Sequence, residues 1–206
     1  MRIGIIGAGM MGLAVARRVA LTGTAVLLAD RSVARARRVA AEASAGAPGC
    51  VLATTMAAAL RSEVVFLALR LPESLELARR QPHVLRGRAV VDLSVPERTD
   101  PVSSAVRQLV CIAPEARWVK ALTTADAGAL HRGATEGHPV DVFVASDDDR
   151  AKVVVVELFD RSGVRAFDAG GLDNAWILEG MGRLGQEVGE RLGLSESWSF
   201  KFMPSW

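Results

Sequence analysis

Six residues near the amino terminus, Gly7-Ala8-Gly9-Met10-Met11-Gly12, constrain the fold more than any other part of the chain. The largely apolar run 2–6 precedes them and is typical of a buried strand, residues 13–20 continue at helical period, and 25–29 form a second apolar run. A G-x-G-x-x-G motif in this strand–helix–strand context is the fingerprint of a dinucleotide-binding βαβ unit. The first thirty-two residues therefore predict that the chain binds a dinucleotide.

The three glycines of this motif have separate roles in such a unit. Gly7 allows a tight turn out of the first strand, Gly9 lets the backbone approach a pyrophosphate, and Gly12 allows the helix to pack closely on the sheet. The helix that starts here offers unpaired N–H groups and the positive end of its dipole to phosphates. We therefore expect the whole stretch, including Ala8, Met10 and Met11, to hold the cofactor.

Asp30 ends the second apolar run, about 20 residues beyond the motif, where such units place the residue that meets the adenosine ribose. A carboxylate there favours NAD, because it accepts hydrogen bonds from a free ribose diol and repels a 2′-phosphate. Arg31, Ser32 and Arg35 could together clamp that phosphate and favour NADP. These residues leave both cofactors open.

Composition narrows the class of protein. The chain has 206 residues and a mass of 21.9 kDa, which suits one domain with a modest extension. A net charge of +2 gives no reason to expect nucleic acid or membrane partners. No spacing is typical of a metal site, and Cys50 and Cys111 are expected to be buried free thiols of a reducing compartment. With no signal peptide or membrane-length apolar run, we expect a cytoplasmic protein.

Apolar runs and helical periods alternate along the chain. The expected strands are 2–6, 25–29, 50–53, 64–69, 89–93, 117–122, 140–145 and 164–168. The main expected helices are 13–20, 33–44, 56–60, 73–79, 103–110, 150–160 and 174–192, with a loop at 133–139. The alternation predicts parallel strands, and we expect an α/β fold of Rossmann type with a doubly wound, mostly parallel sheet at 1–168 and a small helical extension at 169–206.

Ligands of such sheets bind beyond the carboxyl ends of the strands. The residues expected to flank the nicotinamide there are Leu69, Arg70, Ser94, Val95 and Thr123. Arg70 follows a fully apolar strand and could hold an acidic substrate or a cofactor phosphate, although an ordinary surface arginine fits as well. The hydroxyls of Ser94 and Thr123 could bind the carboxamide or ribose, or could only cap the helices that follow.

A proton donor is harder to identify. The chain contains no tyrosine, and no Ser/His/Asp or Cys/His set stands out. A reductase that protonates a carbonyl oxygen usually positions a His, Lys or Tyr, whereas hydride transfer between two organic cofactors mainly needs alignment. Lys120 is the best candidate acid, although a salt-bridge or solvent-facing role is more usual for a lysine at a strand edge. The candidate catalytic residues are therefore Arg70, Lys120 and Thr123.

The second half of the chain carries a family resemblance. Its blocks are Val119-Lys120-Ala121-Leu122-Thr123-Thr124, Val142-Phe143-Val144-Ala145-Ser146-Asp147-Asp148, Phe167-Asp168-Ala169-Gly170-Gly171-Leu172-Asp173-Asn174-Ala175, Leu178-Glu179 and Ser199-Phe200-Lys201. With the amino-terminal half, their order and spacing resemble the NADP oxidoreductases that depend on the deazaflavin coenzyme F420. The resemblance implies hydride exchange with NADP(H), which favours NADP(H) while NAD(H) stays possible, and a helical extension that often builds a homodimer.

The acceptor is less constrained, because Gly171 and Trp176 stand near the presumed acceptor site where the family carries Pro and Arg. We expect hydride transfer between NADPH and a deazaflavin or small unsaturated acceptor, with a dedicated biosynthetic imine or enone reductase as an alternative. A non-catalytic NAD(P) sensor is a third reading, since no proton donor is evident. The helix from Asn174 and the tail from Trp198 to Trp206 are expected to form a subunit interface or to close the substrate pocket.

Overall fold

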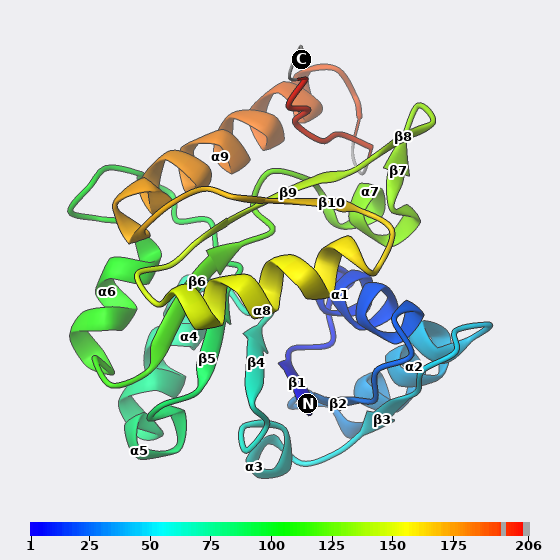
Figure 1. The fold of residues 1–206 in the computed structure, drawn as a ribbon, viewed down its shortest axis with the longest axis vertical. Helices are drawn as coiled ribbons and strands as arrows, with labels where there is room; N and C mark the ends of the chain where they lie inside the picture. Colours follow the sequence, from blue (N-terminus) through cyan, green and yellow to red (C-terminus); the bar gives the residue numbers. More distant parts are fainter. Residues whose placement is uncertain (195–196, 204–206) are drawn as a thin grey trace.

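An eight-stranded sheet runs through the molecule (Figure 1). Its order is β10-β9-β6-β5-β4-β1-β2-β3 in the computed structural model, which describes residues 1–194 and 197–203. The strands are β1 (Ile3–Ile6), β2 (Val26–Ala29), β3 (Val51–Ala53), β4 (Val64–Leu67), β5 (Ala89–Asp92), β6 (Arg117–Ala121), β9 (Asp141–Ala145) and β10 (Arg165–Asp168). A separate hairpin joins β7 (Ala134–Thr135) to β8 (His138–Pro139).

The expected helices are present with ends within a few residues of the prediction, whereas the short helix at Pro82–Leu85 was not predicted. They are α1 (Met10–Leu21), α2 (Val33–Ser44), α3 (Met56–Ala59), α4 (Leu71–Arg80), α5 (Pro82–Leu85), α6 (Ala105–Ile112), α7 (Ala127–Arg132), α8 (Asp149–Asp160) and α9 (Ala175–Arg191), with a 3₁₀ turn at Leu172–Asn174. The bounds of α2 are those expected from the sequence, because Ser32 caps its first turn and an apolar stripe faces the sheet.

Two layers of helices cover the two faces of the sheet. Helices α1, α2, α7 and α8 share one apolar core, in which Phe159 of α8 meets Phe66 of β4 edge to face at 5.9 Å between ring centroids. Helices α3, α4, α5 and α6 share the core on the other face. Strands β1, β4 and β5 are buried along their whole length because both faces are covered. The predicted α/β fold with a doubly wound, mostly parallel sheet is confirmed.

The alternation of strands and helices predicted parallel strands, and this prediction fails at one edge of the sheet. The first six strands pair in parallel, but β9 runs antiparallel to β6, and β10 is parallel to β9. The chain leaves β6 at the carboxyl edge and passes through α7 and the β7–β8 hairpin. It then enters β9 from that same edge without crossing the sheet, so the direction reverses.

Two smaller expectations are also corrected. The segment 133–139, expected to be a loop, contains the β7–β8 hairpin, whose turn residues Glu136 and Gly137 have φ of 49° and 76° as a tight hairpin turn requires. Cys50 and Cys111 are free, but they are exposed rather than buried. Cys50 precedes the edge strand β3, and Cys111 lies off the buried face of α6.

None of the described helices is long and apolar enough to cross a membrane.

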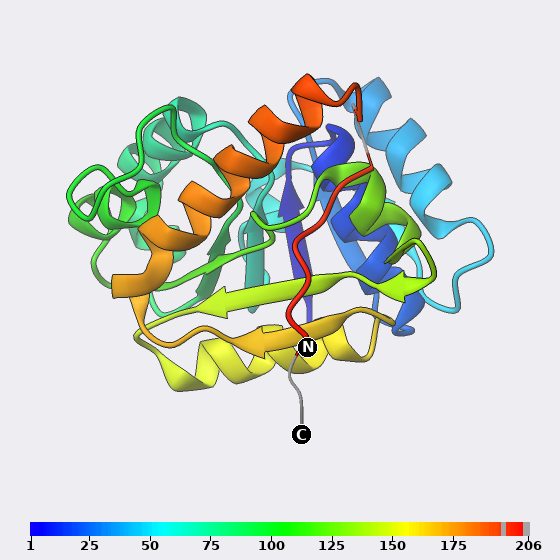
Figure 2. The same cartoon turned by 90° about the horizontal axis from the view of Figure 1, so that it is seen from above.

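Helix α9 and the tail lie over the part of the molecule that follows β6. The hydroxyl of Thr123 donates to the carbonyl of Leu178 in α9 at 2.9 Å. From the end of α9 the tail turns back across β9 and β10 (Figure 2). There Phe202 packs against Phe143 of β9 and Phe167 of β10, with ring centroids 6.5 and 5.6 Å away. The tail around Phe202 therefore packs onto the edge of the sheet that β9 and β10 form.

Candidate active site

The glycine loop between β1 and α1 is shaped for a ligand that approaches its backbone. Gly7 has φ +106°, and a Cβ there would lie 2.2 Å from the carbonyl oxygen of Ala68. A Cβ on Gly12 would lie 2.0 Å from the carbonyl oxygen of Gly7, so both positions require glycine. Gly9 faces open space, and α1 begins at Met10 without a side-chain cap. The N–H groups of its first turn are thus left for an anion, and a pyrophosphate fits this loop.

Asp30 supports this loop from the end of β2. Its carboxylate accepts hydrogen bonds from the backbone N–H of Ala8 at 2.9 Å and of Ser32 at 2.8 Å. Burial by itself raises the pKa of Asp30, but these donors, together with Arg35 and Arg31, more than offset it and hold the pKa below its ordinary value. Both carboxylate oxygens are therefore engaged inside the protein.

A cavity of about 1180 Å³ lies between the glycine loop, the end of β2 and helix α4. Asp30, Arg31, Ser32 and Arg35 all line it, so the structure brings together the residues assigned to the 2′ position. The side chain of Arg35 is 54% exposed, and its guanidinium is 3.9 Å from the carboxylate of Asp30. This loose pairing leaves Arg35 able to contact a further anion in the cavity.

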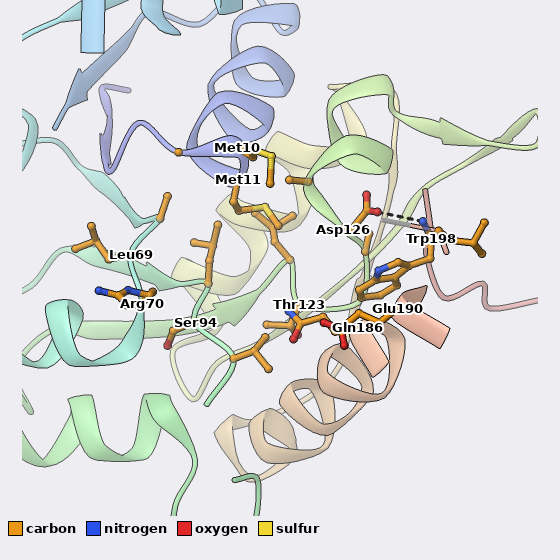
Figure 3. A pocket seen from close by; sticks show the side chains of 18 residues that line it. Met10, Met11, Leu69, Arg70, Ser94, Thr123, Asp126, Gln186, Glu190 and Trp198 are labelled. Atoms are coloured by element: carbon orange, nitrogen blue, oxygen red, sulfur yellow. Dashed lines mark hydrogen bonds between the residues drawn. The ribbon is translucent and has the colours of Figure 1, made fainter. Parts of the chain in front are cut away.

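A second cavity, of about 500 Å³, adjoins the first (Figure 3). Gly9, Ala68, Leu69 and Arg70 line both. The residues assigned from the sequence that line the smaller cavity are Gly9, Met10, Met11, Leu69, Arg70, Ser94, Val95 and Thr123. An extended ligand can therefore pass from one cavity to the other along the glycine loop, as a dinucleotide bound at a switch in strand order must.

Arg70 lies at the junction of the two cavities. Its side chain is 84% exposed, and its guanidinium pairs with Glu73 in the first turn of α4. The hydrogen bond from Arg70 holds the pKa of Glu73 below its ordinary value. An exposed guanidinium at this junction can turn toward a cofactor phosphate or toward an acidic substrate, so the position is compatible with both expected roles.

Lys120 lines neither cavity. Its side chain is 0% exposed, and its ammonium lies 2.7 Å from the carboxylate of Asp92 and 3.1 Å from that of Glu179, while also donating to the carbonyl of Ser94. Three acceptors match the three N–H bonds of an ammonium. Lys120 thus has the salt-bridge role that the sequence analysis gave as the more usual one. A proton donor would have to reach the cavity, and Lys120 does not line it.

The hydroxyls of Ser94 and Thr123 are also turned into the protein. Ser94 donates to the carboxylate of Asp92 at 2.8 Å, and Thr123 donates to the carbonyl of Leu178. Between Thr123 and Lys120, Leu122 adopts φ +64° with its side chain 2% exposed. A leucine seldom takes this left-handed conformation, and such strain concentrates at ligand sites. These residues fix the shape of the cavity wall.

Sequence reasoning missed most of the far wall of the smaller cavity. Asp126, Gln186, Glu190 and Trp198 line it. A signal was present, because Gly182, Gly185 and Gly189 place small residues on one face of the predicted helix 174–192, which allows another segment to pack closely there; Gly185 and Gly189 meet the ring of Trp198. The tail was expected to form an interface or close the pocket, and Trp198 lies at the pocket; Trp206 falls outside the described residues.

Comparison with known proteins identifies the family. The model of the family described as NADP oxidoreductase, coenzyme F420-dependent, matches residues 2–96. The F420-dependent NADP reductase of Methanothermobacter thermautotrophicus is 30% identical over 197 residues, which cover 87% of this chain and 85% of that protein. The chain belongs to this family. The F420-dependent NADP reductase of Methanothermobacter marburgensis is 29% identical over 197 residues, covering 87% of this chain and 88% of that protein.

Solved structures share the fold. A hypothetical protein from Sinorhizobium meliloti has a TM-score of 0.73 at 26% identity, covering 85% of this chain and 88% of that one. A putative F420-dependent NADP reductase from Arthrobacter has a TM-score of 0.76 at 22% identity, covering 97% of this chain and 99% of that one. The family resemblance seen in the sequence is confirmed, and it extends over both halves of the chain.

Proposed function

We propose that this protein transfers a hydride between NADPH and coenzyme F420, or a small unsaturated acceptor in its place. The observation that carries the proposal is the pair of cavities that meet at Gly9, one lined by the basic residues after β2 and the other reaching α9 and the tail. The two F420-dependent NADP reductases that align over most of the chain support both reactants.

The residues of the chain would bind and orient the reactants. The glycine loop would hold the pyrophosphate, and Arg31, Ser32 and Arg35 would meet the 2′-phosphate. Leu69 and Val95 would pack near the nicotinamide, whose reduced ring supplies the hydride when NADPH is bound. Exchange of a hydride between two conjugated rings needs alignment above all, which explains how the site can work with Lys120 committed to its carboxylates.

The deciding experiment follows the oxidation of NADPH and of NADH by its absorbance, with F420, FAD, FMN and several cyclic imines as acceptors. We expect rapid oxidation of NADPH with F420, and slower oxidation of NADH. Tight binding of NADPH without turnover by any acceptor would reject the enzyme proposal and leave the NAD(P) sensor. The cavity beside the glycine loop already counts against a sensor, since it leaves room for a second reactant.

One observation favours the alternative of an imine reductase. In the smaller cavity, the described residues with charged side chains on the wall opposite Arg70 are Asp126 and Glu190, both carboxylates (Figure 3). Carboxylates stabilise a cationic iminium and disfavour an anionic group at that wall. Turnover of a cyclic imine at a higher kcat/KM than F420 would establish this alternative.

We further propose that the protein forms a homodimer through α9. Ile177, Leu184, Val188 and Leu192 lie on one face of this helix and its end, and they are 44%, 53%, 41% and 66% exposed. An exposed apolar stripe on a helix is typical of a surface that a partner covers. Residues 169–206 would thus form an extension that serves both the pocket and the interface.

The free thiols of Cys50 and Cys111 support a reducing compartment such as the cytoplasm.

A further inference from the structure

The indole of Trp198 forms the wall of the smaller cavity opposite Leu69 and Arg70 (Figure 3). A Cβ on Gly185 would lie 2.2 Å from Cζ3 of the indole, and a Cβ on Gly189 would lie 2.8 Å from its Cδ1. The ring therefore rests directly on the backbone of α9, where only glycine leaves room. Because glycine in a helix interior weakens the helix, the two glycines are explained by the space that they give to the ring.

The backbone of the tail keeps the ring in this place. The N–H of Trp198 donates to the carboxylate of Asp126 at 3.2 Å, and the N–H of Asp126 donates to the carbonyl of Trp198 at 3.1 Å. Ser199 then bridges to Ala125, and Phe200 meets the indole edge to face at 6.1 Å. The indole is thus held from the tail and from α9 while it still lines the cavity.

We infer that Trp198 determines acceptor specificity by stacking against a planar conjugated ring and by limiting the depth of the site. Aromatic rings gain from offset stacking beyond the area that they bury. Arg70 lies at the other end of this cavity, and Asp126 and Glu190 lie near the indole (Figure 3). The conjugated ring of the acceptor therefore lies toward Trp198, and any anionic group of the acceptor lies toward Arg70. This inference rests on the proposed function.

The test measures binding of oxidised F420 to the protein saturated with NADP⁺, because two oxidised reactants bind without reacting. The variants are Trp198→Leu, Trp198→Phe and Gly185→Ala, in which the added Cβ displaces the indole. The matched control is Gly180→Ala, on the same helix, where the added Cβ would be an ordinary 3.5 Å from Oγ1 of Thr99. Both substitutions raise helix propensity by the same amount. A difference in F420 binding between the two variants therefore reports the contact of residue 185 with the indole.

We expect Trp198→Leu and Gly185→Ala to weaken F420 binding about tenfold, and Trp198→Phe to keep it within about threefold. The control and the wild-type protein should bind F420 equally, and every variant should bind NADP⁺ alone as the wild type does. Circular dichroism confirms that each variant is folded, and Gly185→Ala still tests the ring if Trp198→Leu unfolds.

Three results would overturn the inference: unchanged F420 binding in Trp198→Leu, equal weakening in Gly180→Ala and Gly185→Ala, or no binding of F420 to the wild type. Failure of the proposed function looks different. F420 binding that depends on Trp198 without any NADPH oxidation rejects the reductase and keeps the stacking role. Turnover of a cyclic imine by a protein that binds no F420 keeps the reductase and rejects the stacking role.

Discussion

At the scale of single residues, the choice between NADP and NAD depends on the segment after β2. The negative charge of Asp30 is met by the N–H groups of Ala8 and Ser32, one of them in the glycine loop itself. Arg31 and Arg35 line the cavity beside it. We therefore propose that Asp30 acts first as a support of the glycine loop, and that Arg31 and Arg35 would meet a 2′-phosphate.

The double variant Arg31→Ala/Arg35→Ala should lose about a hundredfold in kcat/KM for NADPH, because two charge-assisted hydrogen bonds to the phosphate disappear. The kcat/KM for NADH should stay within about threefold, since a ribose hydroxyl has no such charge. Steady-state kinetics with both cofactors checks this. Arg38→Ala is the control, because Arg38 is on the same helix and pairs with Glu42 at 3.3 Å. Equal losses for the two cofactors would contradict the assignment.

At the scale of elements, one buried ionic cluster joins β5, β6 and α9. Asp92 and Lys120 face each other in the register of β5 and β6, and Glu179 reaches Lys120 from α9. The carboxylate of Glu179 also accepts the backbone N–H of Ala105, at the start of α6. Since Asp92 and Lys120 both bind Ser94, the cluster sets the cavity wall and the position of α9 together.

Lys120→Met should therefore destabilise the fold by about 3–5 kcal/mol, because two buried carboxylates lose their cation. Urea unfolding measures the change. Arg117→Ala, on the same strand but with a side chain 46% exposed, should cost less than about 1 kcal/mol. A Lys120→Met variant with unchanged stability and no turnover would instead assign the ammonium to the chemistry.

Asp141 anchors the tail to the antiparallel edge of the sheet. Its fully buried carboxylate accepts from Arg165 at 2.7 Å, from Lys201 at 2.7 Å and from the N–H of Phe202 at 2.7 Å. Burial alone raises the pKa of Asp141, but these donors more than offset it and hold the pKa below its ordinary value. A carboxylate of this kind stabilises the folded state in its ionised form.

The stability that Asp141 supplies should be complete above its unfolded-state pKa of about 3.9 and should be lost as the pH falls through the lower folded-state pKa. Asp141→Asn should cost about 2–3 kcal/mol at neutral pH and lack this acid step. Urea unfolding across the acid range measures it, and limited proteolysis shows whether the tail is released. An acid step of wild-type size in Asp141→Asn would assign the titration to another carboxylate.

At the scale of the whole molecule, the parts fixed by neighbouring residues could be predicted from the sequence. The glycine motif, its helix and the strand before Asp30 form one local unit that was expected from the sequence, although its helix begins at Met10 rather than at Leu13. The direction of β9 could not be predicted, because it depends on the path taken by α7 and the hairpin. The sequence also left the roles of Lys120 and Trp198 open for the same reason, since their partners are on elements far away along the chain.

Assembly can be tested with Leu184→Glu, which places a charge in the apolar stripe of α9. We expect the variant to be monomeric where the wild type is dimeric, because the interface would then bury an unpaired carboxylate. Light scattering coupled to size-exclusion chromatography measures the mass of each. Glu187→Gln, on the same helix and paired with Arg183, should remain dimeric. A wild-type protein that is monomeric at all concentrations would reject the dimer.

The order of the two cavities along the chain has a consequence for biosynthesis. Among the described residues, those that line the larger cavity lie within 6–81, whereas the smaller cavity includes Trp198. A ribosome therefore releases every residue of the cofactor cavity long before it releases the ring that walls the acceptor site. A nascent chain would acquire the contacts of the larger cavity first, and the second reactant would find a complete site only once Trp198 has left the ribosome.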